Sequence, residues 1–382
     1  METWEKSTAK HIVPASSQEL AVRSAAIVTR GLRDLARESN WLIKKVFNGR
    51  SSHVVISPGG QLCAVSPLGR KGEERIVLYD VELCVPTLRL AIPSEPAVIP
   101  PGLPAVFAWS PTARHLVAAW GGWGPELQIF DLQGKALLGG FGEFTNFPSS
   151  LSWSGRGNYF VAASRGGQKA QLRLWHAAPE GSAGIPFSAD PEFEFGAPGP
   201  SGDWLALESD DADSDDECVF SGFGRTDFSP NETRLASVVE IEGEWADDLI
   251  VVLELLTLRR QNIVQAQGHV TGLAWTFDSS QLIYCSAGQA YRLVATGTEP
   301  ESLPFGAELC ACHPYLPLCL CFSSWLKNSA KGRLFLVDLR RLDVFDEYAA
   351  EGVVDLRWSL DGSKAYAVTA DGLAYLYEPP LL

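Results

Sequence analysis

A sevenfold internal repeat constrains the fold of this chain more than any other feature. In each copy a short apolar segment ends at Ser, Thr or His, a turn follows, and two further strand-like segments come next. The seven anchor residues are Ser57, Ser110, Ser154, Ser229, Thr276, His313 and Ser359. The third segment of each copy reads IVLYD, LQIFD, LRLWH, VVLEL, AYRLV, LFLVD or AYLYE. Repeats of about forty residues built only of strand signals indicate a ring of small sheets.

We therefore predict an all-β protein, a seven-bladed β-propeller with four-stranded blades. The last copy has only three strands, whereas the strand-like segment 41–47 precedes the first copy. We expect segment 41–47 to be the outer strand of the last blade, so that pairing of the N- and C-terminal segments closes the ring. Closure removes exposed sheet edges. The stretch 200–208 suggests an eighth, degenerate blade as the alternative, but too few residues remain for all its strands.

The N-terminal region is predicted to lie outside the blades. Residues 1–15 have the composition of a disordered segment, and residues 16–39 have the pattern of a short amphipathic helix. Ser16 and Glu19 form a capping-box signal. The apolar stripe consists of Ala21, Ala25, Val28, Leu32 and Leu35, and the basic residues are Arg23, Arg30, Arg33 and Arg37. We favour packing of the stripe on the propeller rim, and docking on a partner is the alternative.

One repeat interval is unusually long. Seventy-five residues separate Ser154 from Ser229, and within the propeller domain (41–382) residues 177–222 form an insertion rich in Pro, Gly and acidic residues. Its densest part, 209–217, reads SDDADSDDE, and such runs are usually solvated and disordered. A calcium loop is excluded because Asp216 stands where the loop needs glycine, and Gly222 where it needs glutamate.

Charge and hydropathy exclude several classes of function. The formal net charge of −15 disfavours binding to nucleic acid or to anionic membrane surfaces. The start, METWEKSTAK, has no apolar signal core, and no segment has the eighteen or so apolar residues that membrane insertion requires. The expected location is the cytoplasm, with the nucleus open if the host is eukaryotic.

The cysteines allow a metal site as an alternative to core packing. The sequence contains Cys310-Ala-Cys312-His313 and Cys319-Leu-Cys321. A turn at 315–316 would place Cys312 opposite Cys319 and Cys310 opposite Cys321 on one face, where four thiols can hold zinc. The same columns are apolar in other repeats, for example Leu151 and Trp153. Free cysteine packs as a small hydrophobe, so we predict core packing and no metal.

No catalytic or cofactor motif is found in the sequence. It lacks the phosphate-binding glycine loop, the paired zinc histidines and the serine nucleophile motif. We therefore expect no enzyme activity and no cofactor.

At the level of the repeat, the chain resembles the WD-repeat family of propellers. The segments Leu172–His176, Leu127–Asp131, Ile76–Asp80 and Leu334–Asp338 stand where that family ends a strand in Trp-Asp, and Gly268-His269 is similar to its Gly-His dipeptide. In that family this His joins a hydrogen-bonded network with the Trp of its own blade, whereas this blade has Tyr291-Arg-Leu-Val in that segment. The resemblance implies protein–protein scaffolding without catalysis.

Three candidate binding loops contain tryptophan. In WD-repeat-like blades the loop between the second and third strands opens on the same face as the loops between blades. Here these loops contain Trp123, Trp245 and Trp325, and the acids Glu242, Glu244 and Asp247 flank Trp245. Tryptophan is enriched at binding hot spots, although such rings can also cover the blade ends.

The sequence thus predicts a scaffold or assembly subunit that binds other proteins, with basic segments favoured. The alternative is an enzyme or small-molecule binder that uses the central channel. Docking of a partner through the N-terminal helix also remains open.

Overall fold

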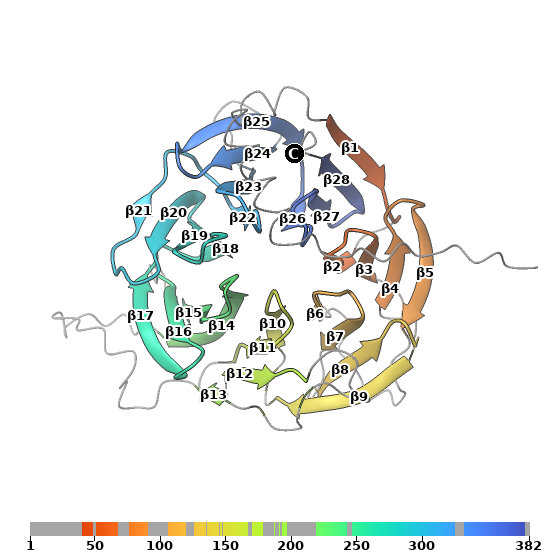
Figure 1. Cartoon of the computed structure of the whole chain (residues 1–382), viewed down its shortest axis with the longest axis horizontal. Helices are drawn as coiled ribbons and strands as arrows, with labels where there is room; N and C mark the ends of the chain where they lie inside the picture. The colour runs from red at the N-terminus through yellow and green to blue at the C-terminus, as the bar shows by residue number, and fades with distance from the viewer. Residues whose placement is uncertain are drawn as a thin grey trace, which may run out of the picture.

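The strands of this chain form a closed ring of seven four-stranded antiparallel sheets (Figure 1). The computed structural model describes residues 40–48, 51–67, 76–90, 106–119, 126–134, 136–144, 146, 148–166, 170–178, 187, 191, 193–196, 219–242, 247–324 and 332–378. The predicted segments 1–15 and 16–39 lie outside these ranges. The prediction of seven blades rather than eight is confirmed.

The first four blades follow the chain order from the innermost to the outermost strand. Blade 1 contains β2 (Ser51–Ile56), β3 (Leu62–Pro67), β4 (Ile76–Asp80) and β5 (Val85–Leu90). Blade 2 contains β6 (Val106–Trp109), β7 (His115–Ala119), β8 (Glu126–Asp131) and β9 (Ala136–Glu143). Blade 3 contains β10 (Pro148–Trp153), β11 (Tyr159–Ser164), β12 (Gln171–His176) and β13 (Phe193–Gly196). Blade 4 contains β14 (Val219–Phe228), β15 (Arg234–Glu242), β16 (Leu249–Glu254) and β17 (Arg259–Gln265). Strand β13 and the start of β14 thus lie within the range 177–222.

The remaining blades include the one that closes the ring. Blade 5 contains β18 (Val270–Trp275), β19 (Gln281–Ser286), β20 (Gln289–Val294) and β21 (Glu301–Ser302). Blade 6 contains β22 (Leu309–Cys312), β23 (Leu318–Ser323), β24 (Gly332–Asp338) and β25 (Asp343–Ala350). Blade 7 contains β26 (Val353–Trp358), β27 (Ala365–Thr369), β28 (Leu373–Glu378) and, as its outer strand, β1 (Asn40–Lys45). Strand β1 pairs with β28 from Asn40–Glu378 to Lys45–Leu373, which confirms the predicted closure.

Each anchor residue closes the turn between the first two strands of its blade. In blade 2 the Ser110 amide donates to the carbonyl of His115, and the Ser110 hydroxyl accepts the His115 amide, both at 2.9 Å. The third residue after the anchor takes a left-handed conformation in six of the turns. It is glycine at positions 60, 157 and 362 but Ala113 (φ 58°), Glu232 (φ 56°) or Ser279 elsewhere. The small polar anchor therefore satisfies a buried amide that the turn would otherwise leave unpaired.

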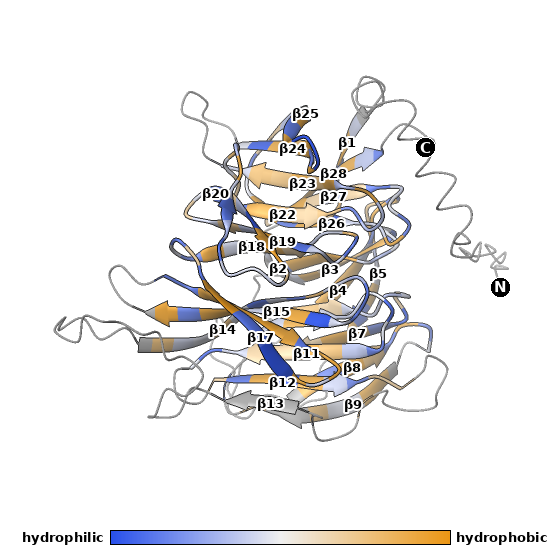
Figure 2. Ribbon diagram, turned by 60° about the vertical axis from the view of Figure 1, so that its left-hand side comes forward, coloured by the Kyte–Doolittle hydropathy of each residue, from blue (hydrophilic) through white to orange (hydrophobic). Residues whose placement is uncertain are grey.

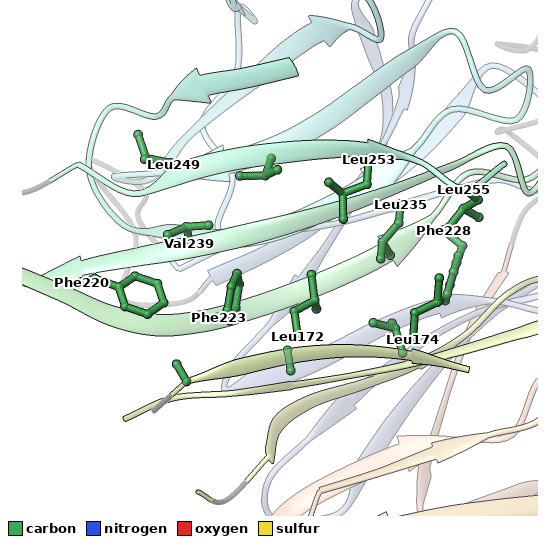
Figure 3. Close-up of a cluster of buried hydrophobic side chains, with 14 of the residues drawn as sticks. Leu172, Leu174, Phe220, Phe223, Phe228, Leu235, Val239, Leu249, Leu253 and Leu255 are labelled. Carbon is green, nitrogen blue, oxygen red and sulfur yellow. The ribbon is translucent and has the colours of Figure 1, made fainter. Parts of the chain in front are cut away.

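The hydrophobic core consists of one cluster between each pair of neighbouring blades. The cluster between blades 3 and 4 includes Leu172 and Leu174 of β12, which point toward Phe220, Phe223 and Phe228 of β14 (Figure 3). A further cluster joins blade 7 to blade 1 through Tyr366 and Val54, among others, so the packing is continuous around the ring. Figure 2 shows β22 and β23 as mostly hydrophobic, whereas the outer strand β17 begins with exposed hydrophilic residues.

Tryptophans that precede the anchors tie neighbouring blades together. The indole nitrogens of Trp109, Trp275 and Trp358 donate to backbone carbonyls in the innermost strand of the preceding blade. The acceptors are Val55, Asp227 and Ala311, at 3.0–3.2 Å. The large apolar residue before most anchors thus packs between blades, and in blades 2, 5 and 7 its indole also hydrogen-bonds across the interface.

Candidate partner-binding face

The two sides of the ring carry different connections. The turn face carries the anchor turns, such as 57–61 and 359–364, and the turns between third and fourth strands, such as 81–84. The loop face carries the connections between second and third strands and those between blades. This assignment follows from the antiparallel order within every blade, since successive connections alternate between the two sides.

The strand ends that flank all three predicted tryptophan loops lie on the loop face. These strand ends are Ala119 and Glu126 in blade 2, Glu242 and Leu249 in blade 4, and Ser323 and Gly332 in blade 6. Trp123, Trp245, Trp325 and Glu244 themselves lie outside the described residues, as does the side chain of Glu242. Because the loops belong to alternate blades, a partner that contacted all three would extend across much of this face.

Two adjacent aspartates in blade 4 hold the edge of the loop face together. The carboxylate of Asp247 accepts the amide of Gly268 at 2.7 Å and the side-chain amide of Gln265 at 3.1 Å. The neighbouring carboxylate of Asp248 is buried and accepts the amides of Val270 at 2.8 Å and Ile241 at 3.3 Å. Asp247, the predicted binding residue of the two, is half-buried and keeps part of its surface accessible.

His269, from the Gly-His dipeptide, belongs to the same network. Its Nδ1 lies 3.2 Å from Asp248 Oδ1, and most of its side chain is exposed. The contact therefore connects the entry to blade 5 with blade 4, while Tyr291 of blade 5 donates to Gln267 at 2.9 Å.

Further acids lie on the loop face of the described residues. Glu240 forms an ion pair with Arg165, and Asp371 forms one with Lys45 at 3.8 Å. The carboxylate of Glu308 accepts a hydrogen bond from the Ser324 hydroxyl, and Glu351 is exposed. The strand ends Gly196 and Val219, between which the acidic run 209–217 lies in the sequence, are also on this side.

A second group of charged side chains comes from the innermost strands of blades 1, 4 and 7. His53 is in β2, Asp227 in β14, and Asp355 and Arg357 in β26, where Arg357 Nε lies 3.1 Å from Asp355 Oδ2. Burial raises the pKa of Asp227 to about 7, although the amide of Trp275 and the charge of Arg357 oppose this shift. Burial also raises the pKa of Asp355 and lowers the pKa of His53 to about 4.

This inner group is brought together only by the ring. The charge of Arg357 in blade 7 acts on both His53 and Asp227, which are distant in sequence and belong to other blades. Perturbed titratable groups of this kind occur at ligand sites and also in structural networks. No local motif surrounds any of the four residues, so sequence reasoning did not find the group.

The predicted cysteine register is confirmed. Cys310 pairs with Cys321 and Cys312 with Cys319 across β22 and β23. Cys310, Cys319 and Cys321 are buried in the cluster between blades 5 and 6, together with Cys285, and all are free thiols. Within the described part of the chain, no group of three or more His, Cys, Asp or Glu residues is arranged to hold a metal ion.

No protein-family model matches the chain, and no curated protein is significantly similar to it. The described residues also contain no helix that is long and apolar enough to cross a bilayer. The described residues form a seven-bladed propeller.

Proposed function

We propose that this protein is a non-enzymatic interaction scaffold, or assembly subunit, whose loop face binds a positively charged protein segment. The observation that carries the proposal is the common position of the three tryptophan loops. The strand ends that flank them share one face with Asp247, Glu308, Glu351 and the strand ends on either side of the acidic run 209–217. Apolar rings supply the buried area of such a contact, and the surrounding carboxylates select for basic residues.

The proposed anchors are Trp123, Trp245 and Trp325, with Glu242, Glu244 and Asp247 selecting charge. Since the three loops lie on blades 2, 4 and 6, the fitting partner is an extended segment or a domain that covers the face. A short peptide held by one loop would lose little affinity when the other two are changed.

The first experiment is purification of the tagged protein from its native host at modest salt, with the stoichiometry of co-eluting proteins. A partner recovered in this way is then titrated against the variant Trp123→Ala/Trp245→Ala/Trp325→Ala. We expect a loss of at least about tenfold in affinity, since hot-spot truncation costs about 2 kcal/mol or more. Phe277→Ala, an exposed ring on the turn face, is the matched control. Equal affinity of the triple variant and the wild type would refute the site assignment.

The inner charged group supports a second candidate, a small-molecule binder that uses the central channel. His53, Asp227, Asp355 and Arg357 offer both donors and acceptors from three blades. A thermal-shift screen with a metabolite library tests this role. A stabilising compound whose effect disappears in Arg357→Ala would favour it over the scaffold.

A further inference from the structure

The turn face has exposed apolar side chains. Among the described residues, the large hydrophobic side chains that are exposed on this side are Leu83, Val85, Leu256, Phe277, Val294, Tyr315 and Leu360. All of them lie in or directly beside the turns between first and second or third and fourth strands. Single exposed apolar residues need no explanation, so those that lie in adjoining turns carry more weight.

Two of these residues lie in adjoining turns of blades 6 and 7. Tyr315 (37% exposed) follows the anchor His313, and Leu360 (41% exposed) follows the anchor Ser359. The ring of His313 lies 3.1 Å from the carbonyl oxygen of Gly362, in the turn that contains Leu360. The amide of Leu360 in turn donates to Pro58 of blade 1 at 3.2 Å. Hydrogen bonds thus connect the turn that contains Leu360 to both neighbouring blades.

The N-terminal segment joins the ring at the boundary of the same two blades. Asn40 pairs with Glu378, and Glu378 forms an ion pair at 2.7 Å with Lys364, at the end of the turn that contains Leu360. The next residue, Trp41, stacks on Tyr348 of blade 6 with ring centroids 5.6 Å apart. Asn40 therefore lies on the outermost strand of blade 7, at the end that faces the same side as the turns of Tyr315 and Leu360.

The sequence that precedes Asn40 has the pattern needed to cover such a surface. Residues 16–39 carry an apolar stripe that ends with Leu32 and Leu35, the two members nearest the ring. A helix of this length would extend about 36 Å, enough to cross more than one blade.

We propose that residues 16–39 dock on the turn face of their own chain, with Leu32 and Leu35 packed against Tyr315 and Leu360. The occupant is in cis because the covalent connection begins on the same face of blade 7, so its effective concentration is high. Docking on the turn face leaves the loop face free. This inference therefore does not depend on the proposed function.

Hydrogen–deuterium exchange of the full-length protein, read by mass spectrometry, tests the docking. In the wild type we expect amides 21–35 to exchange at least about tenfold more slowly than in the isolated peptide 16–39. Leu360→Asp and Leu32→Asp/Leu35→Asp should each abolish that protection without unfolding the ring, which far-UV circular dichroism monitors. Val354→Asp is the matched control, since Val354 is equally exposed (43%) but lies at the loop-face end of β26.

Each other outcome contradicts the proposal. Fast exchange of amides 21–35 in the wild type would show that the segment does not dock. Protection that increases with protein concentration, together with a dimer in light scattering, would identify a second copy as the occupant. Protection that appears only after a purified partner is added would assign the segment to that partner.

Discussion

His313 of blade 6 donates a hydrogen bond from Nε2 to the carbonyl oxygen of Gly362 in blade 7, at 3.1 Å. The donor is assigned because a carbonyl oxygen can only accept. At the same time, Nδ1 accepts the amides of Tyr315 and Leu316 at 2.9 and 3.0 Å. The ring must therefore be neutral, because a protonated Nδ1 could not accept them. Burial lowers the pKa of His313 to about 4, consistent with this arrangement.

This arrangement predicts an acid-sensitive contribution of His313 to stability. Its folded pKa of about 4 lies below the ordinary value of 6.5, so the unfolded chain binds more protons between these two values. The stabilisation is present above pH 6.5 and is lost as the pH falls toward 4. Between pH 7 and pH 5 the wild type should lose about 2 kcal/mol more unfolding free energy than a variant without the imidazole.

Urea unfolding of the wild type, His313→Ser and His313→Gln at pH 7 and pH 5 measures this difference. Both variants lower the absolute stability, but only the change between the two pH values is compared. Equal pH dependence in all three proteins would show that His313 is not held neutral.

Asp227 should contribute the opposite pH dependence. Its folded pKa of about 7 lies above the ordinary 3.8, so the folded state binds more protons between these values and stability falls as the pH rises through them. Asp227→Asn keeps an acceptor for the Trp275 amide, which Asp227 binds at 3.1 Å. Relative to the wild type, this variant should gain up to about 4 kcal/mol between pH 4 and pH 8. A difference in unfolding free energy that stays constant over that range would contradict the prediction.

The fold could be predicted because each repeat is marked by residues that lie close together in the sequence. Each anchor recurs with its turn and its following strands, and the surplus segment at 41–47 matches the strand missing after Glu378. The cysteine register also followed from the position of one turn.

Other features have no local signal. The left-handed turn position is occupied by Ala113, Glu232 and Ser279, so no glycine marks it in those blades. Strand β13 has four residues within a region of low hydrophobicity, and only the ladder with β12 makes it a strand. The contact between the turns that contain Tyr315 and Leu360 depends on the packing of blade 6 against blade 7, which neither turn's own sequence specifies.

The contribution of an anchor hydroxyl to stability can be tested at Ser110. Ser110→Ala leaves the buried amide of His115 without its acceptor, which should cost about 1–3 kcal/mol of unfolding free energy. Ser110→Thr retains the hydroxyl and should cost much less, because Thr276 accepts the amide of Gln281 in the corresponding turn of blade 5. Urea denaturation compares the three proteins. A loss in the threonine variant as large as in the alanine variant would show that side-chain volume dominates.

In strand β1, which closes the ring, the neighbouring residues Trp41 and Leu42 differ in how much they contact the rest of the protein. Trp41 contacts Tyr348 and Tyr377, with ring centroids 5.6 and 4.9 Å apart, whereas Leu42 is half exposed. Trp41→Ala should lower the unfolding free energy by about 3 kcal/mol, and Leu42→Ala by about 0.5 kcal/mol or less. Equal costs, measured by thermal and urea unfolding, would mean that the aromatic contacts do not hold β1 in place.

The cysteine thiols should react at different rates, because their burial differs. Burial raises the pKa of Cys63, and hydrogen bonding with Cys285 followed by burial raises that of Cys310, whereas Cys84 is partly exposed in the turn 81–84. Iodoacetamide should therefore modify Cys84 at least about a hundredfold faster than Cys63 or Cys310 in the native protein, since the buried thiols react only after local opening. Mass spectrometry of the alkylated peptides gives the rates.

The same labelling experiment decides between core packing and a zinc site at blade 6. If Cys310, Cys312, Cys319 and Cys321 bound zinc, the purified protein would contain one equivalent of metal, and a chelator would speed alkylation of all four together. With thiols that are only packed in the core, the chelator changes none of the rates, and Cys312, the least buried of the four, reacts first. A chelator-dependent rate with stoichiometric zinc would overturn the core assignment.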